Sequence, residues 1–176
     1  MGLICMSNSN MDMLYYTNVN WEQYFHHVKQ RADDTVKVMY KPEYEDLIDE
    51  ACRPLIKWFN QFTNIATIYC CSGHVDEETG GSPGYISILF QDTNAENSVM
   101  RLLREAMCKG RECKIPFEIE LGVYFGHLHE TIDKNHWVAN LIIRTNSYKR
   151  KNTYDRYWHR LYNIITTCNT EGLYTI

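Results

Sequence analysis

The stretch NIATIYCCSGHVDEETGGSPGYISILF, residues 64–90, decides the fold. Two apolar runs, at 65–71 and 85–91, have the length and composition of β-strands, and they flank a loop that is rich in glycine and acidic residues. A connection of this length can join two antiparallel neighbours in a sheet. The stretch therefore predicts a β-hairpin, with the sequence Cys-Cys-Ser-Gly-His at the end of its first strand.

Helical patterns lie on both sides of this hairpin. Apolar residues recur with a period of about 3.6 in residues 42–62 and 94–110, which predicts two amphipathic helices. Pro54 lies inside the first pattern, so we expect a kink there or two shorter helices that meet there. The other patterns predict helices at 20–31 and 152–168, strands within 116–132 and 136–145 joined by a turn at 133–135, and a short strand at 36–40.

The predicted order of the core elements is α-β-β-α-β-β-α. Because each pair of strands has a connection short enough for a hairpin, this order predicts an α+β fold with a four-stranded, mainly antiparallel sheet and helices packed on one face. Residues 1–20 are rich in Asn, Met and Ser, and we expect them to form a loosely ordered N-terminal arm. Residues 21–176 are expected to form a single α+β domain.

The composition excludes several classes of protein. Hydrophobic residues make up 44% and charged residues 23% of the 176 residues, as in an ordinary globular domain. No apolar run is long enough for a transmembrane helix. Seven irregularly spaced cysteines and a start that is unlike a secretory signal predict reduced thiols and a cytoplasmic location. The net charge of −4 argues against non-specific binding of nucleic acid by the whole surface, but it leaves room for a local basic patch.

Cys71, Ser72, Gly73 and His74 bring several functional groups to the start of the hairpin loop. Gly73 permits a tight turn, and such a turn can direct consecutive backbone N–H groups at an anion. Ser72 adds a hydroxyl, and His74 adds a hydrogen-bond donor or a base. We therefore expect these residues to bind a phosphate, a nucleotide or the carboxylate of a cofactor. The alternative is a turn that merely follows a strand.

A basic and aromatic segment extends from residue 144 to residue 160. We expect Arg144 or Lys149 to complete the charge of the ligand site, since basic side chains hold phosphates. Tyr157 and Trp158 fall at a spacing typical of the core, so we expect them to be mainly buried against the sheet. Asp155 is the one acid in the segment, and the basic residues are Arg144, Lys149, Arg150, Lys151, Arg156 and Arg160.

His127 and His129 are two residues apart on a predicted strand, so their side chains are expected on the same face. If the sheet places His74 beside them, the three histidines could bind a metal ion. Two surface histidines near a turn are the alternative. Glu118 and Glu120 on the same predicted hairpin could supply acid–base groups.

Two short segments resemble a known family. IYCCSGH, residues 68–74, resembles the Ser-Cys-Ser-Gly-Arg loop of the wybutosine-synthesis methyltransferases that act on transfer RNA, and PFEIELGVYF, residues 116–125, is similar to the Phe-Glu-Pro-Phe-containing strand of that family. This resemblance implies S-adenosylmethionine and a transfer-RNA purine, although His74 replaces the family's Arg and Cys70 its Ser. The same loop also resembles the Ser-Cys-x-Gly-His loop of small bacteriophage proteins, which implies a virus-encoded protein in the host cytoplasm.

Three functions stay open. We favour the binding of a nucleotide-like or other anionic small ligand, in a virus-encoded protein that sequesters a nucleotide signal or regulates a host process. The second is an RNA- or nucleotide-modifying enzyme, either methyltransferase-like or a His-based phosphoesterase. The third is a protein–protein interaction module without a small ligand. A nucleotide-type small molecule is the expected partner, with RNA and a second copy of the chain as alternatives and no membrane. The sequence assigns no catalytic residue and no cofactor.

Overall fold

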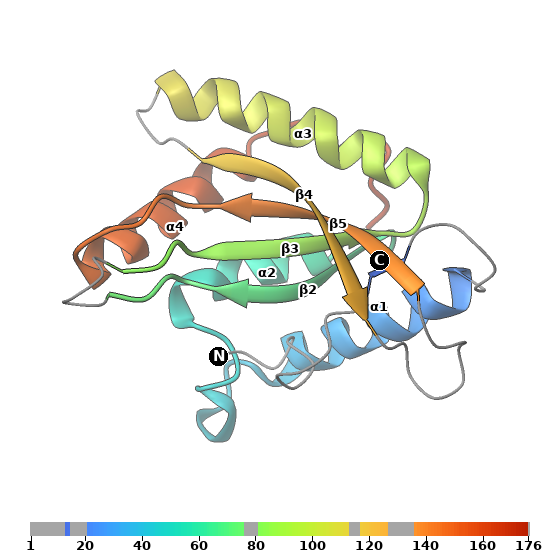
Figure 1. The fold of residues 1–176 in the computed structure, drawn as a ribbon, viewed down its shortest axis with the longest axis horizontal. Coiled ribbons are helices and arrows are strands. Elements are labelled where there is room, and N and C mark those ends of the chain that lie inside the picture. Colours follow the sequence, from blue (N-terminus) through green and yellow to red (C-terminus); the bar gives the residue numbers. More distant parts are fainter. Residues whose placement is uncertain (1–12, 15–20, 76–80, 113–116, 127–135, 176) are drawn as a thin grey trace.

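The fold is α+β, as predicted (Figure 1). The computed structural model describes residues 13–14, 21–75, 81–112, 117–126 and 136–175. Two 3-10 turns, Pro42–Tyr44 and Glu50–Cys52, precede the second helix. The elements are β1 (Met13–Leu14), α1 (Trp21–Val38), α2 (Arg53–Asn60), β2 (Ile65–Cys71), β3 (Tyr85–Phe90), α3 (Thr93–Glu112), β4 (Glu118–Gly126), β5 (His136–Arg144) and α4 (Lys151–Ile165).

The strands form one sheet in the order β1-β5-β3-β2, and β4 also pairs with β5. The β2–β3, β3–β5 and β4–β5 pairs are antiparallel, whereas β1 pairs with β5 in parallel. The sheet thus has five strands instead of the predicted four, because Met13–Leu14 pairs with Trp137–Val138. Apart from this dipeptide, the predicted N-terminal arm lies outside the described residues.

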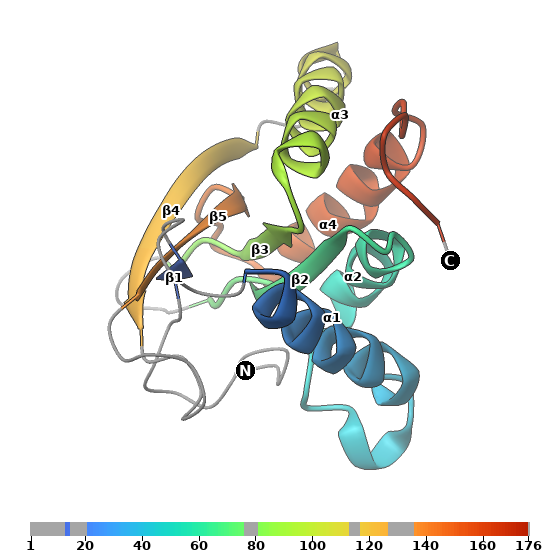
Figure 2. The same cartoon turned by 90° about the vertical axis from the view of Figure 1, so that its right-hand side faces the viewer.

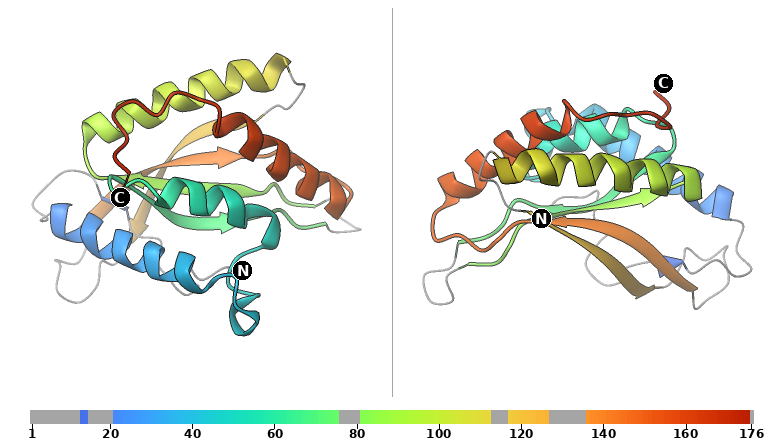
Figure 3. Two further views of the ribbon diagram at one scale, coloured as in Figure 1. Left: turned by 180° about the vertical axis from the view of Figure 1, so that it is seen from behind. Right: turned by 90° about the horizontal axis from the view of Figure 1, so that it is seen from above.

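Helices α2, α3 and α4 lie against one face of the sheet, which we call the inner face (Figure 3). Residues that alternate along the strands, such as Cys70, Ile86 and Ile143, point into this layer and are buried. Trp158 on α4 is fully buried there, as predicted from its spacing. Its indole Nε1 donates a hydrogen bond to the carbonyl oxygen of Ser72 at 2.9 Å, which ties α4 to the end of β2.

Helix α1 lies along the edge of the sheet beside β2 (Figures 1 and 2). Apolar residues from Tyr24 to Ala32 pack against strand residues that point to the opposite face, which we call the outer face, whereas Val36 near the end of the helix packs against the inner layer. The expectation that all helices cover one face is therefore wrong for α1. This second cluster consists of Tyr24, Phe25, Val28 and Ala32 from α1 with Ala66, Ile68, Tyr69 and Leu89 from the sheet.

The strand predicted at residues 36–40 is wrong, because α1 continues to Val38. The apolar stripe of the helix continues from Ala32 to Val36 at a spacing of four residues. Ion pairs on successive turns support the helix, with Lys29 Nζ 2.6 Å from Asp33 Oδ1. The alternation of Val36 and Val38 with polar residues imitates a strand only over a few residues.

The predicted helix over 42–62 is shorter than expected, since α2 begins at Arg53 and ends at Asn60. Pro54 lies in the first turn of α2, where its missing N–H costs no intrahelical hydrogen bond. The helix predicted at 94–110 is confirmed, with Asp92 Oδ1 accepting a hydrogen bond from the N–H of Ala95 at 2.8 Å. In the part of the chain that the structure describes, no helix is sufficiently long and apolar to cross a membrane.

Asn60 connects α2, β2 and α1 through buried hydrogen bonds. Its Oδ1 accepts a hydrogen bond from the N–H of Thr67 at 3.0 Å, and its Nδ2 donates to Thr67 Oγ1. Its backbone oxygen accepts a hydrogen bond from Lys29 Nζ. These contacts precede a β-bulge at Ile68, where β2 slips by one residue against β3.

Replacing Asn60 with alanine is expected to destabilise the fold by about 1–3 kcal/mol, because it leaves the buried N–H and hydroxyl of Thr67 without their partner. Urea unfolding monitored by far-UV circular dichroism measures this loss. The matched control is Asn163→Ala on the exposed face of α4, which should change stability by less than about 0.5 kcal/mol. Equal stability of the two variants would contradict the role of Asn60.

Candidate functional site

The turn at Cys71–His74 is shaped by Gly73, whose φ is +101°. A Cβ at this position would lie 2.3 Å from Cε1 of Tyr154, so both the backbone conformation and the packing require glycine. The turn is closed by a reciprocal backbone pair in which the N–H of His74 donates to Ser82 O at 3.2 Å and the N–H of Ser82 donates to His74 O at 2.9 Å. His74 is consequently held at a defined place beyond the end of β2.

The backbone amides of this turn donate to groups inside the protein. The N–H of Ser72 donates to Asp49 Oδ2 at 2.7 Å, and that of Gly73 to Cys71 Sγ at 3.4 Å. The N–H of His74 is used in the pair with Ser82. An anion cradle built from these amides is therefore wrong, because a carboxylate, a sulfur and a carbonyl oxygen already occupy them.

Ser72 faces away from Cys71, as expected for consecutive residues of an extended chain. It is 6% exposed and lines a cavity of about 490 Å³ on the helical side of the loop. Three carboxylates and a single lysine line this cavity, so its negative electrostatic potential disfavours the binding of an anionic ligand. The lining residues are Tyr40, Asp49, Glu50, Ala51, Pro54, Ser72, Lys151, Asp155 and His159.

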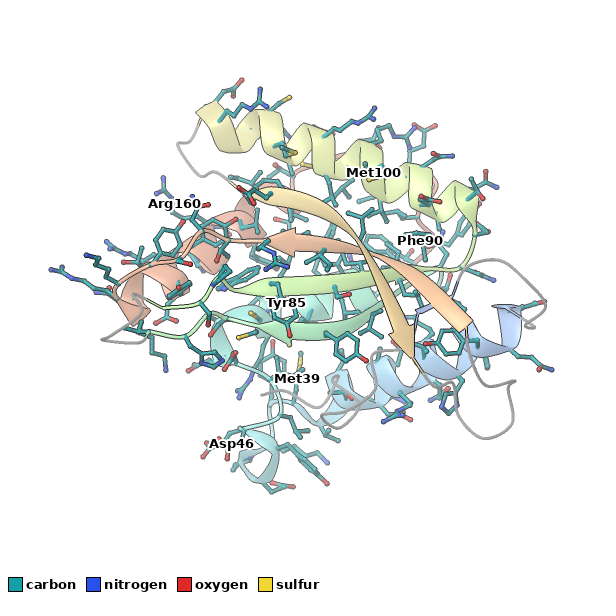
Figure 4. The ribbon with its side chains drawn as sticks, in the orientation of Figure 1. Met39, Asp46, Tyr85, Phe90, Met100 and Arg160 are labelled. Carbon is teal, nitrogen blue, oxygen red and sulfur yellow. The ribbon has the colours of Figure 1, made fainter. Side chains whose placement is uncertain are left out.

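The strand register aligns four polar side chains across the outer face. Cys71 on β2 is the partner of Tyr85 on β3, Tyr85 is the partner of Arg144 on β5, and Arg144 is the partner of Glu118 on β4. Directly opposed residues of antiparallel strands project to the same face, with Cβ atoms about 5 Å apart. We call Cys71, Tyr85, Arg144 and Glu118 the polar row, and Figure 4 shows Tyr85 on the face of the sheet turned away from α2.

His74 extends this polar row at the Cys71 end. Its Nε2 lies 3.2 Å from Cys71 Sγ, which is a hydrogen-bonding distance for a thiol and an imidazole. Cys71 is half-buried, whereas His74 is exposed. Cys70 points instead into the inner layer, so the two adjacent cysteines lie on opposite faces of β2.

The loop that leads into α4 reaches the same end of the sheet. Tyr154 Oη accepts a hydrogen bond from the N–H of Tyr148 at 2.8 Å and donates to Ser82 O at 2.8 Å. Lys149, next to Tyr148, is exposed, and Arg144 ends β5. The structure thus brings Arg144 and Lys149 to the end of the sheet that also carries Cys71 and His74.

The basic segment is exposed, while its aromatic residues are buried. Tyr157 and Trp158 are 5% and 0% exposed, as their helical spacing predicted, and burial raises the pKa of the Tyr157 hydroxyl. Their ring faces are therefore not open to stacking by the bases of a nucleic acid. The exposed basic residues are Lys149, Arg150, Lys151, Arg156 and Arg160, of which Figure 4 labels the last on α4.

The predicted three-histidine metal site stays a prediction, since His127 and His129 lie outside the described residues. Within the described ranges, no group of three histidine, cysteine or acidic side chains could hold a metal ion. Two residues of this region, Tyr85 and Asp49, were not predicted from the sequence. Tyr85 could have been found as the first strand residue after the loop, whereas Asp49 lies 23 residues before the amide it binds and carries no local signal.

Comparisons with known proteins place the chain in no family. No protein-family model matches it, and no curated protein matches it. Among solved structures, its fold is similar to that of the PH1069 protein from Pyrococcus horikoshii, with a TM-score of 0.42 and 11% sequence identity over 83% of this chain and 94% of that chain. A likeness at this level carries no argument about function.

Tyr154→Phe is expected to separate the two loops while keeping the ring that packs on Gly73. The loss of hydrogen bonds to Tyr148 N and Ser82 O should cost about 1–2 kcal/mol and should speed hydrogen exchange at the Tyr148 amide. Denaturant unfolding and amide exchange measure the two effects. Tyr174→Phe, at a side chain that is 60% exposed, is the control and should change neither.

Proposed function

We propose that this protein binds a nucleotide-like, anionic small ligand on the polar row of the outer face. The observation that carries the proposal is the register of β3, β4 and β5, which places Arg144 between Tyr85 and Glu118. A cation, an aromatic ring and a carboxylate then lie side by side on three strands. These are the groups that suit a phosphate, a base and a ribose or base edge, respectively.

Each side chain has a separate role in this proposal. The Arg144 guanidinium binds the phosphate, because its planar donors can hold two oxygen atoms at once. The Tyr85 ring offers a stacking face, and the Glu118 carboxylate accepts hydrogen bonds from a hydroxyl or an exocyclic amine. Exposed Lys149 adds positive charge at the same end of the sheet. His74 lies at the rim of this surface, beside Cys71.

Binding without turnover would suit the sequestration of a nucleotide signal. The virus-encoded role rests on the loop resemblance to bacteriophage proteins and stays a prediction. The backbone amides of the turn already have acceptors within the protein, and the helical side of the loop is lined by Asp49, Glu50 and Asp155. Both observations favour the outer face as the ligand site. A phosphate would be repelled on the helical side and attracted by Arg144 on the opposite side of the sheet.

Arg144→Gln is expected to weaken nucleotide binding by about 10- to 100-fold, the effect of losing about 1.5–3 kcal/mol in charge-assisted hydrogen bonds. Isothermal titration calorimetry with adenosine and guanosine monophosphates, and with inorganic phosphate as the minimal anion, measures this change. Arg104→Gln, at an exposed position on α3, removes the same charge far from the row and should bind like the unmodified protein.

Three results would count against this proposal. The first is no heat of binding with any nucleotide, and the second is equal affinity of the Arg144→Gln and Arg104→Gln variants. Native mass spectrometry of the bound nucleotide provides the third, since recovery of a cleaved or methylated product would favour the modifying enzyme. A macromolecular partner that co-purifies with a protein indifferent to nucleotides would favour the interaction module.

A further inference from the structure

The Cys71 thiol differs in its surroundings from the other described thiols. Its Sγ lies 3.2 Å from His74 Nε2 and accepts a hydrogen bond from the N–H of Gly73 at 3.4 Å. Cys52, Cys70 and Cys168 are buried, and burial raises the pKa of the Cys52 and Cys168 thiols. Thiols buried in this way are poor nucleophiles, because the thiolate is the reactive form.

The fold holds the sulfur and the imidazole together through a turn that only glycine can make. The positive φ of Gly73 returns the chain towards Cys71, and the Tyr154 ring packs where a Cβ would project. The backbone pair with Ser82 fixes the main chain of His74 from the other side. The contact between Cys71 and His74 is thus built into the loop by at least two independent restraints.

We propose that Cys71 and His74 form a nucleophilic thiol pair on the outer face, and that Cys71 is the site at which soft carbon electrophiles become covalently attached. His74 Nε2, as the unprotonated nitrogen of the imidazole, accepts the Sγ proton, and the Gly73 N–H stabilises the resulting thiolate. The thiolate attacks the electrophilic carbon, an S–C bond forms, and the bond to the leaving group breaks. The leaving group departs with its electron pair, and the imidazolium releases its proton to water.

Charged and titratable groups of both signs surround Cys71, so some favour its thiolate and others oppose it. Protonated His74 favours the thiolate directly, whereas Arg144 lies two strands away in the polar row. Tyr85 is the cross-strand neighbour, and Glu118 lies one strand beyond Arg144. Asp49 accepts from the adjacent amide of Ser72, and Cys52 interacts electrostatically with Cys71 from the inner layer. Only His74 combines direct contact with the ability to accept the proton.

The proposal does not depend on nucleotide binding, so its test uses iodoacetamide alone on the full chain. Brief alkylation at pH 6.0 and pH 9.0, followed by peptide mass spectrometry, gives a rate for each cysteine. Cys108 is exposed on α3 and serves as the reference thiol in the same molecule. At pH 6.0 Cys71 is expected to react at least about tenfold faster than Cys108, and at pH 9.0 the two rates should converge, since an ordinary thiol ionises near pH 8.5.

His74→Ala is expected to lower the rate at Cys71 by about tenfold at pH 6.0, and His26→Ala, at an exposed position on α1, should leave it unchanged. Buried Cys70 reports on folding, because it stays unmodified only while the sheet is intact. A Cys71 rate at pH 6.0 no greater than that of Cys108, or one that His74→Ala leaves unchanged in a folded protein, would overturn the proposal. If the His74→Ala variant does not fold, the comparison of Cys71 with Cys108 in the unmodified protein decides alone.

Discussion

Tyr154 holds together the two loops at the end of the sheet, and the candidate site depends on that contact. Its ring fills the space left by the missing side chain of Gly73, while its hydroxyl bridges Tyr148 N and Ser82 O. One buried side chain on α4 therefore sets both the path of the turn after β2 and the path of the loop after β5. Because Tyr154 and Ser82 are 72 residues apart along the chain, no local preference could bring them together.

The alignment of the polar row follows from this arrangement. Each hydrogen-bonded strand pair fixes which residues face one another, so a change of one residue in register would turn Arg144 into the inner layer. The reciprocal contacts between Gly84 and Thr145 fix the register where β3 begins and β5 ends, with both N···O distances at 2.8 Å. The Gly84–Thr145 contacts and the hydrogen bonds between the strands therefore fix the same alignment of the polar row.

The sequence predicted those features that have a local cause. The bounds of β2 follow from an apolar run that ends at a turn, and α3 follows from the helical periodicity of residues 94–110. The alternation of Val36 and Val38 misled the prediction, because such a short pattern fits the end of a helix as well as a strand. The order and register of the strands could not be predicted from the sequence, because β3 and β5 are separated by a helix and another strand. The hydrogen bond from the Ser72 amide to Asp49 could not be predicted either, because the two residues are 23 positions apart in the sequence.

The turn after β2 separates the outer face of the sheet from a cavity that is lined by acidic side chains. On the helical side, Asp49, Glu50 and Asp155 line the cavity next to Ser72, and one of these carboxylates binds the Ser72 amide. On the outer face, the neighbours of Cys71 include the imidazole of His74 and, two strands away, the guanidinium of Arg144. A carboxylate close to Cys71 would oppose formation of a thiolate. Placing Asp49 behind the strand satisfies the buried amide of Ser72, and the intervening chain keeps the Asp49 carboxylate on the other side of the sheet from Cys71.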